Sequence, residues 1–337
     1  MRTAGLVSAI MPVYRGEHFV AAAIESVLAQ TYRSFELVIV NDGSPDGSAG
    51  VISRFLPHPQ IRYVEQPNAG VAAARNTGLA NAKGAFIALL DQDDLWLPTK
   101  LERQIVYLGA HPEVGLVHSR VECIDAAGRP CPCTGAIAVY PLAGLCAGRL
   151  LLGNGIAPLT VLIRRSCLDE VGGFDQRFAP ADDWELWLRI ARSQALGFMD
   201  EVTARYRVHD QMVSKDLSRM QQTVLSIMDS ICERFPEVAQ SVRAEEFALA
   251  RGRSLRLVAE ALDRCGRRAE ARSFWRETYR TCGDVDALLA LLGMSFEWRR
   301  RVQLRGTPLR RFVSWYLYKL RSAARLLMRQ GSGGKNG

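Results

Sequence analysis

The alternation of apolar runs with helix-like segments constrains the fold of this chain more than any other feature of the sequence. The strand-like segments are LVSAIMP at 6–12, FELVIV at 35–40, IRYVEQ at 61–66 and AFIALL at 85–90, and all but IRYVEQ are mainly apolar. Segments with helical spacing, such as EHFVAAAIESVLAQ and VAAARNTGLANA, lie between them. Strands that are apolar throughout and separated by helices form parallel sheets covered on both faces. The sequence therefore predicts an α/β fold built on a mainly parallel sheet.

Polar loops stand at the carboxyl ends of these strands. MPVY, NDGS, QPNAG and DQDD mark the ends of the first, second, third and fourth strand. Open α/β sheets bind their ligands outside the carboxyl ends of the strands. We therefore expect these four loops, which are distant in sequence, to meet in one crevice.

Three carboxylates follow the fourth strand, in the sequence DQDD. Asp91 and Asp93 are two residues apart where the extended chain begins to turn, and Asp94 comes next. Carboxylates this close suit a hard cation, and Mg²⁺ or Mn²⁺ held by one or two protein oxygens takes a substrate diphosphate as a further ligand. The alternative is that DQDD caps a helix starting near Pro98. On the residues alone, both interpretations stay open.

The loops after the second and third strands add further candidate ligands. Asp42 stands where a carboxylate can hydrogen-bond a base or a ribose, although NDGS is also an ordinary turn sequence. Asn68 and Gly70 precede a helix that carries Arg75 in its first turns, a geometry suited to an anion. A surface ion pair is the alternative role for Arg75.

Taken together, these motifs resemble a family 2 glycosyltransferase of the GT-A fold. The matching segments are MPVY, SVLAQTY, VNDGSPDGS, PNAGVAAARNTGLANAKG, LLDQDDLWLPTKLE, VGGFDQRF, ADDWELWLRI and YRVHDQMVS, within roughly residues 5–214. The resemblance implies the GT-A nucleotide-diphospho-sugar transferase fold, with a Rossmann-like mainly parallel sheet. It also implies transfer of a sugar from a nucleotide diphosphate donor with inversion at the anomeric carbon. Asn41 departs from the family, where many members carry aspartate, while Asp42 is retained.

The resemblance assigns residues to the nucleotide sugar: Pro12, Tyr14, Asp42, Arg75, Asp91 and Gln92. The first three would surround the nucleobase, and the arginine would approach the nucleotide. Asp91 would contact the ribose. Uracil is the favoured base, and guanine and thymine stay open.

The same resemblance implies a metal site and a catalytic base. Asp93 would hold Mn²⁺ or Mg²⁺ against the diphosphate, and His209 matches a family position near the metal, although a lone histidine is often structural. Family members use the aspartate of a Glu-Asp pair at the start of a helix to deprotonate the acceptor. This chain has Asp182 and Asp183 there, so Asp183 is the candidate base. Two acids at a helix N-terminus are also what the helix dipole alone favours.

Basic residues are concentrated near the C-terminus. Residues 296–329 hold ten basic residues and one acid, whereas residues 1–295 hold 32 basic and 34 acidic residues. A nucleic-acid enzyme more often places such charge around its active site, so we expect no nucleic-acid partner. Apolar residues of 309–329 share one helical face opposite arginines. This face is predicted either to rest on an anionic membrane surface or to pack on the protein.

Four regions are expected along the chain: a GT-A domain at 1–214, a helical domain at 215–295, a basic amphipathic helical segment at 296–330 and a disordered tail at 331–337. No apolar run is long enough for a membrane-spanning helix, and the N-terminus lacks a signal-peptide pattern. We therefore expect a cytoplasmic protein, peripheral on the cytoplasmic face if 309–329 binds a membrane. The eight cysteines lack the spacing of a disulfide framework and are predicted to be reduced.

The sequence thus predicts a metal-dependent glycosyltransferase of the hexosyltransferase type. It would move one sugar from a nucleotide diphosphate donor, a UDP-sugar, to an acceptor hydroxyl in cell-surface polysaccharide or glycoconjugate synthesis. The acceptor, a glycan or a lipid-linked molecule, is not readable from the sequence. The Q-x-x-R-W element of processive synthases is absent from the sequence, which favours single-sugar addition. The alternative is a non-catalytic scaffold protein that binds sugar nucleotides.

Overall fold

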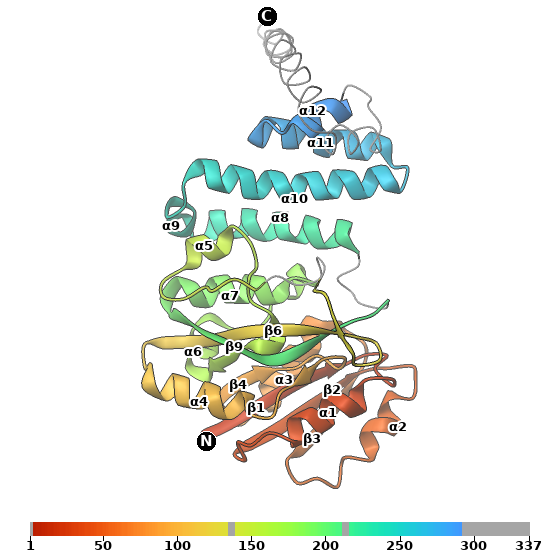
Figure 1. Ribbon diagram of the computed structural model, residues 1–337, viewed down its shortest axis with the longest axis vertical. Helices are drawn as coiled ribbons and strands as arrows, with labels where there is room; N and C mark the ends of the chain where they lie inside the picture. Colours follow the sequence, from red (N-terminus) through yellow and green to blue (C-terminus); the bar gives the residue numbers. More distant parts are fainter. Residues whose placement is uncertain (1–2, 134–138, 211–215, 292–337) are drawn as a thin grey trace, which may run out of the picture. The chain divides into compact units, whose positions relative to one another are not determined.

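The computed structural model describes residues 3–133, 139–210 and 216–291 of the 337-residue chain. The chain divides into two compact units, one ending at Phe247 and the other beginning at Ala248. All the strands among the described residues belong to the first unit (Figure 1). The boundaries expected at 214 and 295 stay predictions. The basic segment 296–330, its face at 309–329 and the tail 331–337 lie outside the described residues.

The first part of the sheet is parallel, as the sequence predicted. Its elements are β1 (Thr3–Val13), α1 (Val20–Leu28), β2 (Phe35–Asp42), α2 (Ser48–Ser53), β3 (Ile61–Gln66), α3 (Val71–Asn81) and β4 (Gly84–Leu89). The strands lie in the order β3-β2-β1-β4, and every neighbouring pair is parallel. Leu37, Val38, Ile39 and Val40 are all buried, because helices cover both faces of this part of the sheet.

The second part of the sheet mixes strand directions. Its elements are β5 (Leu95–Trp96), α4 (Lys100–Ala110), β6 (Val114–Asp125), β7 (Pro130–Cys131), α5 (Ala147–Leu151), η1 (Pro158–Thr160), β8 (Leu162–Arg164), α6 (Arg165–Val171), η2 (Gln176–Phe178), α7 (Asp182–Ser193) and β9 (Ala195–Val208). The sheet continues from β4 as β8-β6-β9-β5, with β7 paired to β6. Strand β8 is antiparallel to both of its neighbours, whereas the long strands β6 and β9 are parallel to each other. The expected α/β class is therefore confirmed, as a mixed, mainly parallel sheet.

Helix α3 packs unusually close to strand β1. Its inner face consists of small residues, including Ala72, Ala73 and Ala74, which are buried. A Cβ atom added to Gly78 would lie 2.4 Å from Cγ2 of Ile10 in β1. Because real Cβ atoms do not approach other atoms this closely, glycine is required here. The close packing fixes α3 firmly on the sheet.

A lysine is buried at the start of α4. Lys100 Nζ donates hydrogen bonds to Gln104 Oε1 at 2.6 Å and to the carbonyl oxygen of Val161 at 3.0 Å. It also lies 4.6 Å from the centre of the Trp96 ring. Burial lowers the pKa of Lys100 well below its ordinary value, because the charged form loses its hydration.

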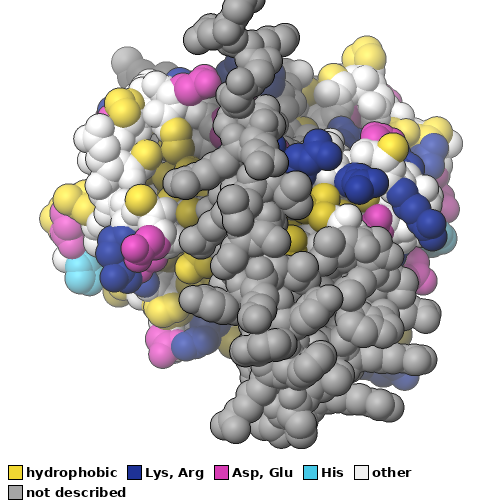
Figure 2. Space-filling model, turned by 90° about the horizontal axis from the view of Figure 1, so that it is seen from above, with side chains coloured by type: hydrophobic (Ala, Val, Ile, Leu, Met, Phe, Trp, Pro, Cys, Tyr) yellow, Lys and Arg dark blue, Asp and Glu magenta, His cyan; other side chains and the backbone are white. Residues whose placement is uncertain are grey.

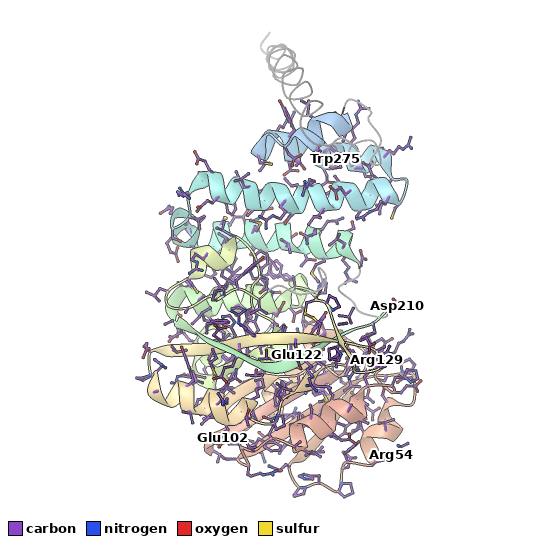
Figure 3. All side chains as sticks on the ribbon, in the orientation of Figure 1. Arg54, Glu102, Glu122, Arg129, Asp210 and Trp275 are labelled. Carbon is purple, nitrogen blue, oxygen red and sulfur yellow. A yellow bond between two sulfur atoms is a disulfide. The ribbon has the colours of Figure 1, made fainter. Side chains whose placement is uncertain are left out.

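The chain from residue 217 to residue 291 is helical, as expected. The helices are α8 (Leu217–Arg234), α9 (Pro236–Gln240), α10 (Ala244–Arg264), α11 (Arg268–Cys282) and α12 (Val285–Leu291). Trp275 of α11 (Figure 3) is buried, and its Nε1 donates to Asp263 Oδ2 of α10 at 2.8 Å. None of the described helices is both long enough and apolar enough to cross a membrane.

Ion pairs compensate much of the positive charge in the second unit. Figure 2 shows Lys and Arg side chains on the described surface together with acidic and apolar ones. Arg251 pairs with Glu277 at 3.4 Å, and Arg267 pairs with Glu270 at 2.6 Å. In each of these pairs an acid lies against a surface arginine and offsets its charge locally.

The prediction that all cysteines are reduced is wrong for one pair. Cys123 and Cys133 form a disulfide, with Cα atoms 5.3 Å apart. The antiparallel pairing of β6 and β7 places Cys131 opposite Cys123, which brings Cys133 within reach two residues later. This hairpin has no cysteine-spacing signature, so the sequence could not reveal the bond. The other six cysteines are not in disulfides.

Candidate active site

The loops that follow β1, β2 and β4 lie at one edge of the sheet, because β1 is the strand between β2 and β4. Two hydrogen bonds join the first of these loops to the DQDD segment. The backbone N–H of Tyr14 donates to Gln92 Oε1 at 2.8 Å, and Gln92 Nε2 donates to the carbonyl oxygen of Tyr14 at 2.9 Å. The structure thus brings Tyr14 and Gln92, both assigned to the nucleotide sugar, into direct contact.

Tyr14 and Pro12 differ in their access to a ligand. Pro12 is buried within β1 opposite Val40, whereas Tyr14 is 40% exposed at the strand end. An open cavity of about 290 Å³ lies between the loops after β1 and β2, and it is lined by Arg15, Glu17, His18, Pro45 and Asp46. Tyr14 therefore offers an accessible ring at this edge, and Pro12 shapes the strand beneath it.

Asp42 fixes the loop in front of α3. Its carboxylate accepts hydrogen bonds from Gln66 Nε2 at 2.7 Å and from the backbone N–H groups of Ala69 and Gly70 at 2.9 and 2.8 Å. Gly70 has φ +90°, a conformation that glycine adopts readily and other residues avoid. Asp42 is buried, and both of its oxygens are used by the protein itself. The structure therefore gives it a clear architectural role beside the nucleobase role assigned from the sequence.

Arg75 joins two carboxylates that are far apart in sequence. Its NH2 group donates to both oxygens of Asp91 at 3.0 and 3.1 Å, and its NH1 group donates to Asp182 Oδ2 at 3.0 Å. Only 4% of Arg75 is exposed. Burial lowers the pKa of Arg75, but the carboxylates of Asp91, Asp182 and Asp183 raise it more, so the guanidinium stays charged. The sequence alternative of a surface ion pair is wrong, because this pair is internal.

Asp93 faces the end of strand β9. His209 Nε2 lies 2.8 Å from Asp93 Oδ2, and the imidazole rests against Phe19 with ring centres 4.8 Å apart. The parallel pairing of β6 with β9 ends at Asp125 and Val208, directly before His209. The long strand β9 thus carries the histidine to the edge where β4 places the aspartate.

Arg207, which the sequence analysis missed, holds the DQDD segment in place. Its backbone N–H donates to Asp94 Oδ1 at 2.9 Å, and its Nε donates to the carbonyl oxygen of Asp93 at 2.7 Å. Burial, reinforced by the charges of Asp93 and Asp91, raises the pKa of Asp94 well above its ordinary value. Asp94 is therefore a structural residue of this segment, which leaves Asp93 and Asp91 as its accessible acids.

The residues at this edge fit a divalent cation that is bound together with a diphosphate. One carboxylate oxygen of Asp93 and one imidazole nitrogen of His209 contact each other at 2.8 Å, and a cation that bound both would take the place of this contact. Among the described residues, no cluster of three or more His, Cys, Asp or Glu side chains forms a complete metal cage. An open pair of ligands is what Mg²⁺-type sites use when substrate phosphates and waters supply the remaining ligands.

Asp183 lies at the start of α7, beside Asp182 and in contact with a loop residue that the sequence analysis missed. Asn154 Nδ2 donates to Asp183 Oδ2 at 3.2 Å. Burial and the adjacent charge of Asp182 raise the pKa of Asp183 to about 7, against the opposing effect of Arg75. A carboxyl group that titrates near neutrality can accept a proton from a hydroxyl during a reaction at ordinary pH.

The family model for "Glycosyl transferase family 2" matches residues 8–133. An Escherichia coli relative, UDP-Glc:alpha-D-GlcNAc-diphosphoundecaprenol beta-1,3-glucosyltransferase WfgD, is 32% identical over 215 residues, which are 63% of this chain and 80% of the relative. An uncharacterized glycosyltransferase of Rickettsia felis is 33% identical over 215 residues, or 63% of this chain. The matched segment spans only 36% of the length of that Rickettsia protein.

Solved structures show the same fold at low sequence identity. S. aureus TarS 1-349 in complex with UDP-GlcNAc has a TM-score of 0.57 and 17% identity, with 88% of this chain and 93% of that chain covered. Mannosyltransferase PcManGT from Pyrobaculum calidifontis, in complex with GDP-Man and Mn²⁺, has a TM-score of 0.56 and 20% identity, with 95% and 86% covered. The expected GT-A architecture, a mixed sheet followed by helices, is thereby confirmed.

Proposed function

Because this chain belongs to glycosyl transferase family 2, we propose that it moves one sugar from a UDP-sugar to an acceptor hydroxyl, with inversion at the anomeric carbon. The observation that carries the proposal is the shared contact of Asp91 and Asp182 with one guanidinium. It brings the strand end assigned to the donor next to the helix that carries the candidate base. An inverting transfer needs the donor site and the base close together, because the acceptor oxygen that the base deprotonates attacks the bound donor directly.

On the donor side, the accessible groups of the edge would bind the nucleotide. The exposed ring of Tyr14 would contact the nucleobase, and Asp91, whose side chain is 33% exposed, would bind the ribose. Pro12, Asp42 and Gln92 would act by shaping the loops around the nucleotide, since they are engaged with the protein itself. Arg75 would act indirectly, by holding Asp91 in place through their ion pair.

Asp93 and His209 would hold a Mn²⁺ or Mg²⁺ ion that the donor brings with its diphosphate. When bound, such an ion supplies neutralising charge for the leaving nucleoside diphosphate. PcManGT is similar in fold and was solved with Mn²⁺ and GDP-Man, which supports a metal here.

On the acceptor side, Asp183 would take the proton of the attacking hydroxyl. Asn154 orients its carboxylate through Oδ2, and the pKa of about 7 makes it a base at neutral pH. Direct attack on the anomeric carbon needs no covalent intermediate on the protein, which agrees with an inverting outcome.

The acceptor would be a glycan or a lipid-linked sugar in cell-surface polysaccharide or glycoconjugate synthesis. The name of WfgD includes UDP-Glc as donor and a diphosphoundecaprenol-linked acceptor, which supports this class. We further propose a GT-A domain at 1–214, a helical domain at 215–295, and a cytoplasmic location in which 309–329 binds the membrane that presents the acceptor.

The test is a donor screen on the full chain. UDP-, GDP- and dTDP-sugars are incubated with Mn²⁺ or Mg²⁺ and with a panel of glycan and lipid-linked acceptors, and nucleoside diphosphate release is measured. Release from a UDP-sugar that increases with one acceptor supports the proposal. Tight binding of sugar nucleotides with neither transfer nor hydrolysis would instead support the scaffold alternative. A matched Asp183→Asn variant should bind the donor as wild type does and release nucleoside diphosphate at least about 100-fold more slowly.

A further inference from the structure

The buried arginine of α3 has contacts that a merely stabilising ion pair does not need. The guanidinium of Arg75 lies between Asp91, at the end of β4, and Asp182, at the start of α7. The face of the guanidinium lies 5.4 Å from the centre of the Phe174 ring, in the loop between α6 and α7. A single side chain therefore touches the donor strand, the helix of the candidate base and the loop between α6 and α7.

The next residue of the same helix reinforces this link. Asn76 Nδ2 donates to the carbonyl oxygen of Phe174 at 2.7 Å, and the backbone N–H of Phe174 donates to Asn76 Oδ1 at 2.8 Å. A Cβ atom on Gly173 would lie 2.4 Å from Asn76 Oδ1, so any larger residue there would push against the side chain that holds the loop. Two consecutive residues of α3 thus hold the segment that leads into α7.

The charged network is costly for stability alone. Arg75 Nε and Asp182 Oδ1 are buried, and neither has a hydrogen-bond partner among the described residues. Leaving polar atoms of a buried ion pair unsatisfied destabilises the folded state, and apolar side chains would often serve stability better. Networks of this kind persist where their geometry serves a site.

We propose that Arg75 is a positioning residue for the transfer step. Its guanidinium fixes Asp182, and through Asp182 the adjacent base Asp183, at a set distance from the donor-binding Asp91. The inference rests on the proposed function, since it concerns the geometry of the same transfer. Its physical basis is the fork of the guanidinium, which presents separate N–H groups to two carboxylates, whereas the single ammonium of a lysine cannot match both. If the carboxylate of Asp183 is displaced by about 1 Å, the rate of transfer falls about 100-fold, because the base and the acceptor hydroxyl no longer align.

The experiment compares Arg75→Lys and Asp182→Ala with the wild type, using the donor and acceptor found in the screen. Both variants remove the link between α3 and α7, from opposite sides. We expect kcat for transfer to fall about 100-fold in each. The KM for the donor should change less than about threefold in Asp182→Ala, because this variant leaves the bonds between Arg75 and Asp91 in place. A variant Arg75→Ala should regain part of its kcat when guanidinium ion is added at millimolar concentration, and the same concentration of urea should have no effect.

A matched control is Arg189→Lys. Arg189 is also buried, 6% exposed, lies on α7, pairs with Glu185 and holds the carbonyl oxygen of Gly173, but it touches neither Asp91 nor Asp182. This variant should lose thermal stability as Arg75→Lys does and keep the wild-type kcat of the folded protein.

The outcomes separate the two proposals. A wild type that neither transfers nor hydrolyses any sugar nucleotide refutes the proposed function, and the positioning role with it. A wild type that transfers, together with Arg75→Lys and Asp182→Ala variants that keep kcat, refutes the positioning role alone. Equal losses in kcat for Arg189→Lys and Arg75→Lys would also overturn it, and so would a rise in donor KM in Asp182→Ala as large as the fall in kcat. If Arg75→Lys fails to fold, Asp182→Ala decides.

Discussion

Asp93 and His209 meet at 2.8 Å although 116 residues separate them in the chain. The contact joins the segment between β4 and β5 to the end of β9, and it follows from the antiparallel pairing of β5 with β9 that begins at Leu95 and Arg205. It forms the open pair of ligands on which the proposed metal dependence rests.

We predict that Asp93→Ala lowers transfer by about 100-fold or more, because a bound cation contributes several kcal/mol to the stabilisation of the leaving group. His209→Ala should raise the Mn²⁺ concentration needed for half-maximal activity. Both effects can be measured by titrating Mn²⁺ into the release assay. Glu122→Gln is the control, since Glu122 of β6, labelled in Figure 3, pairs with Arg205 of β9 rather than with a residue assigned to the metal. Unchanged activity in Asp93→Ala would rule out this metal site.

The pH dependence of transfer should follow Asp183. Its pKa of about 7 means that the reactive carboxylate is half formed near neutrality, so kcat should rise with pH and level off above about 8. Asp183→Asn should lower kcat by about 100- to 10,000-fold. Burial raises the pKa of Asp183 most and the charge of Asp182 raises it further, whereas Arg75 and the hydrogen bonds from the Trp184 N–H and Asn154 lower it.

Asp182→Asn separates charge from position at the same site. The asparagine oxygen can still accept from Arg75, but the negative charge that raises the pKa of Asp183 is removed. The rising limb of the pH profile should therefore move to lower pH. Asp200→Asn, in which the replaced side chain is 70% exposed, should leave the profile in place. A shift to higher pH in Asp182→Asn contradicts the assignment.

Lys100 should make the free energy of unfolding depend on pH in the alkaline range. Its folded-state pKa is lowered by burial, while the unfolded chain has the ordinary value of 10.5. Between these two values the unfolded state binds more protons, so stability rises with pH, by up to about 1.4 kcal/mol per pH unit. Lys100→Met removes this dependence, so the difference in Tm between wild type and variant should grow in favour of wild type from pH 7 to pH 9.5. A difference that stays constant with pH would mean that Lys100 is charged in the folded protein.

Reduction of the Cys123–Cys133 disulfide should destabilise the first unit. The bond closes a short loop, with a sequence separation of 10. Closing a loop of this size contributes roughly 2–3 kcal/mol by restricting the unfolded chain. Urea unfolding with and without dithiothreitol measures the difference, and Cys133→Ser should abolish it. Equal midpoints for oxidised and reduced wild type would show that the bond does not form in solution.

The sequence predicted the first part of the fold well because its signal is local. FELVIV is apolar except for Glu36, and it forms most of β2, a strand covered on both faces. The second part was harder to predict. Strand β9 reads ALGFMDEVTARYRV, with polar residues on its partly exposed face, and no periodicity marked it as the longest strand of the sheet.

The contacts within the candidate site were less predictable than the residues. The sequence singled out Arg75, Asp91 and Asp183, but the partners of Arg75 lie 16 and 107 residues away. No spacing rule connects residues so far apart, since only the folded sheet brings α3 against α7. Arg207 and Asn154 were missed for the same reason, as neither belongs to a motif. The roles of the site residues stay predictions until the variants are measured.

Helix α3 serves both substrates of the proposed reaction, and this limits how the protein can be redesigned or can diverge. Its first residues are held by Asp42 in the loop that faces the nucleotide, and one turn later Arg75 and Asn76 hold the approach to α7. An exchange of residues 66–70 to accept another nucleobase would also shift the helix that aligns the base. New donor preferences should therefore arise together with compensating changes at 75, 76 and 173–174, and libraries that vary the donor loop alone should yield few active proteins.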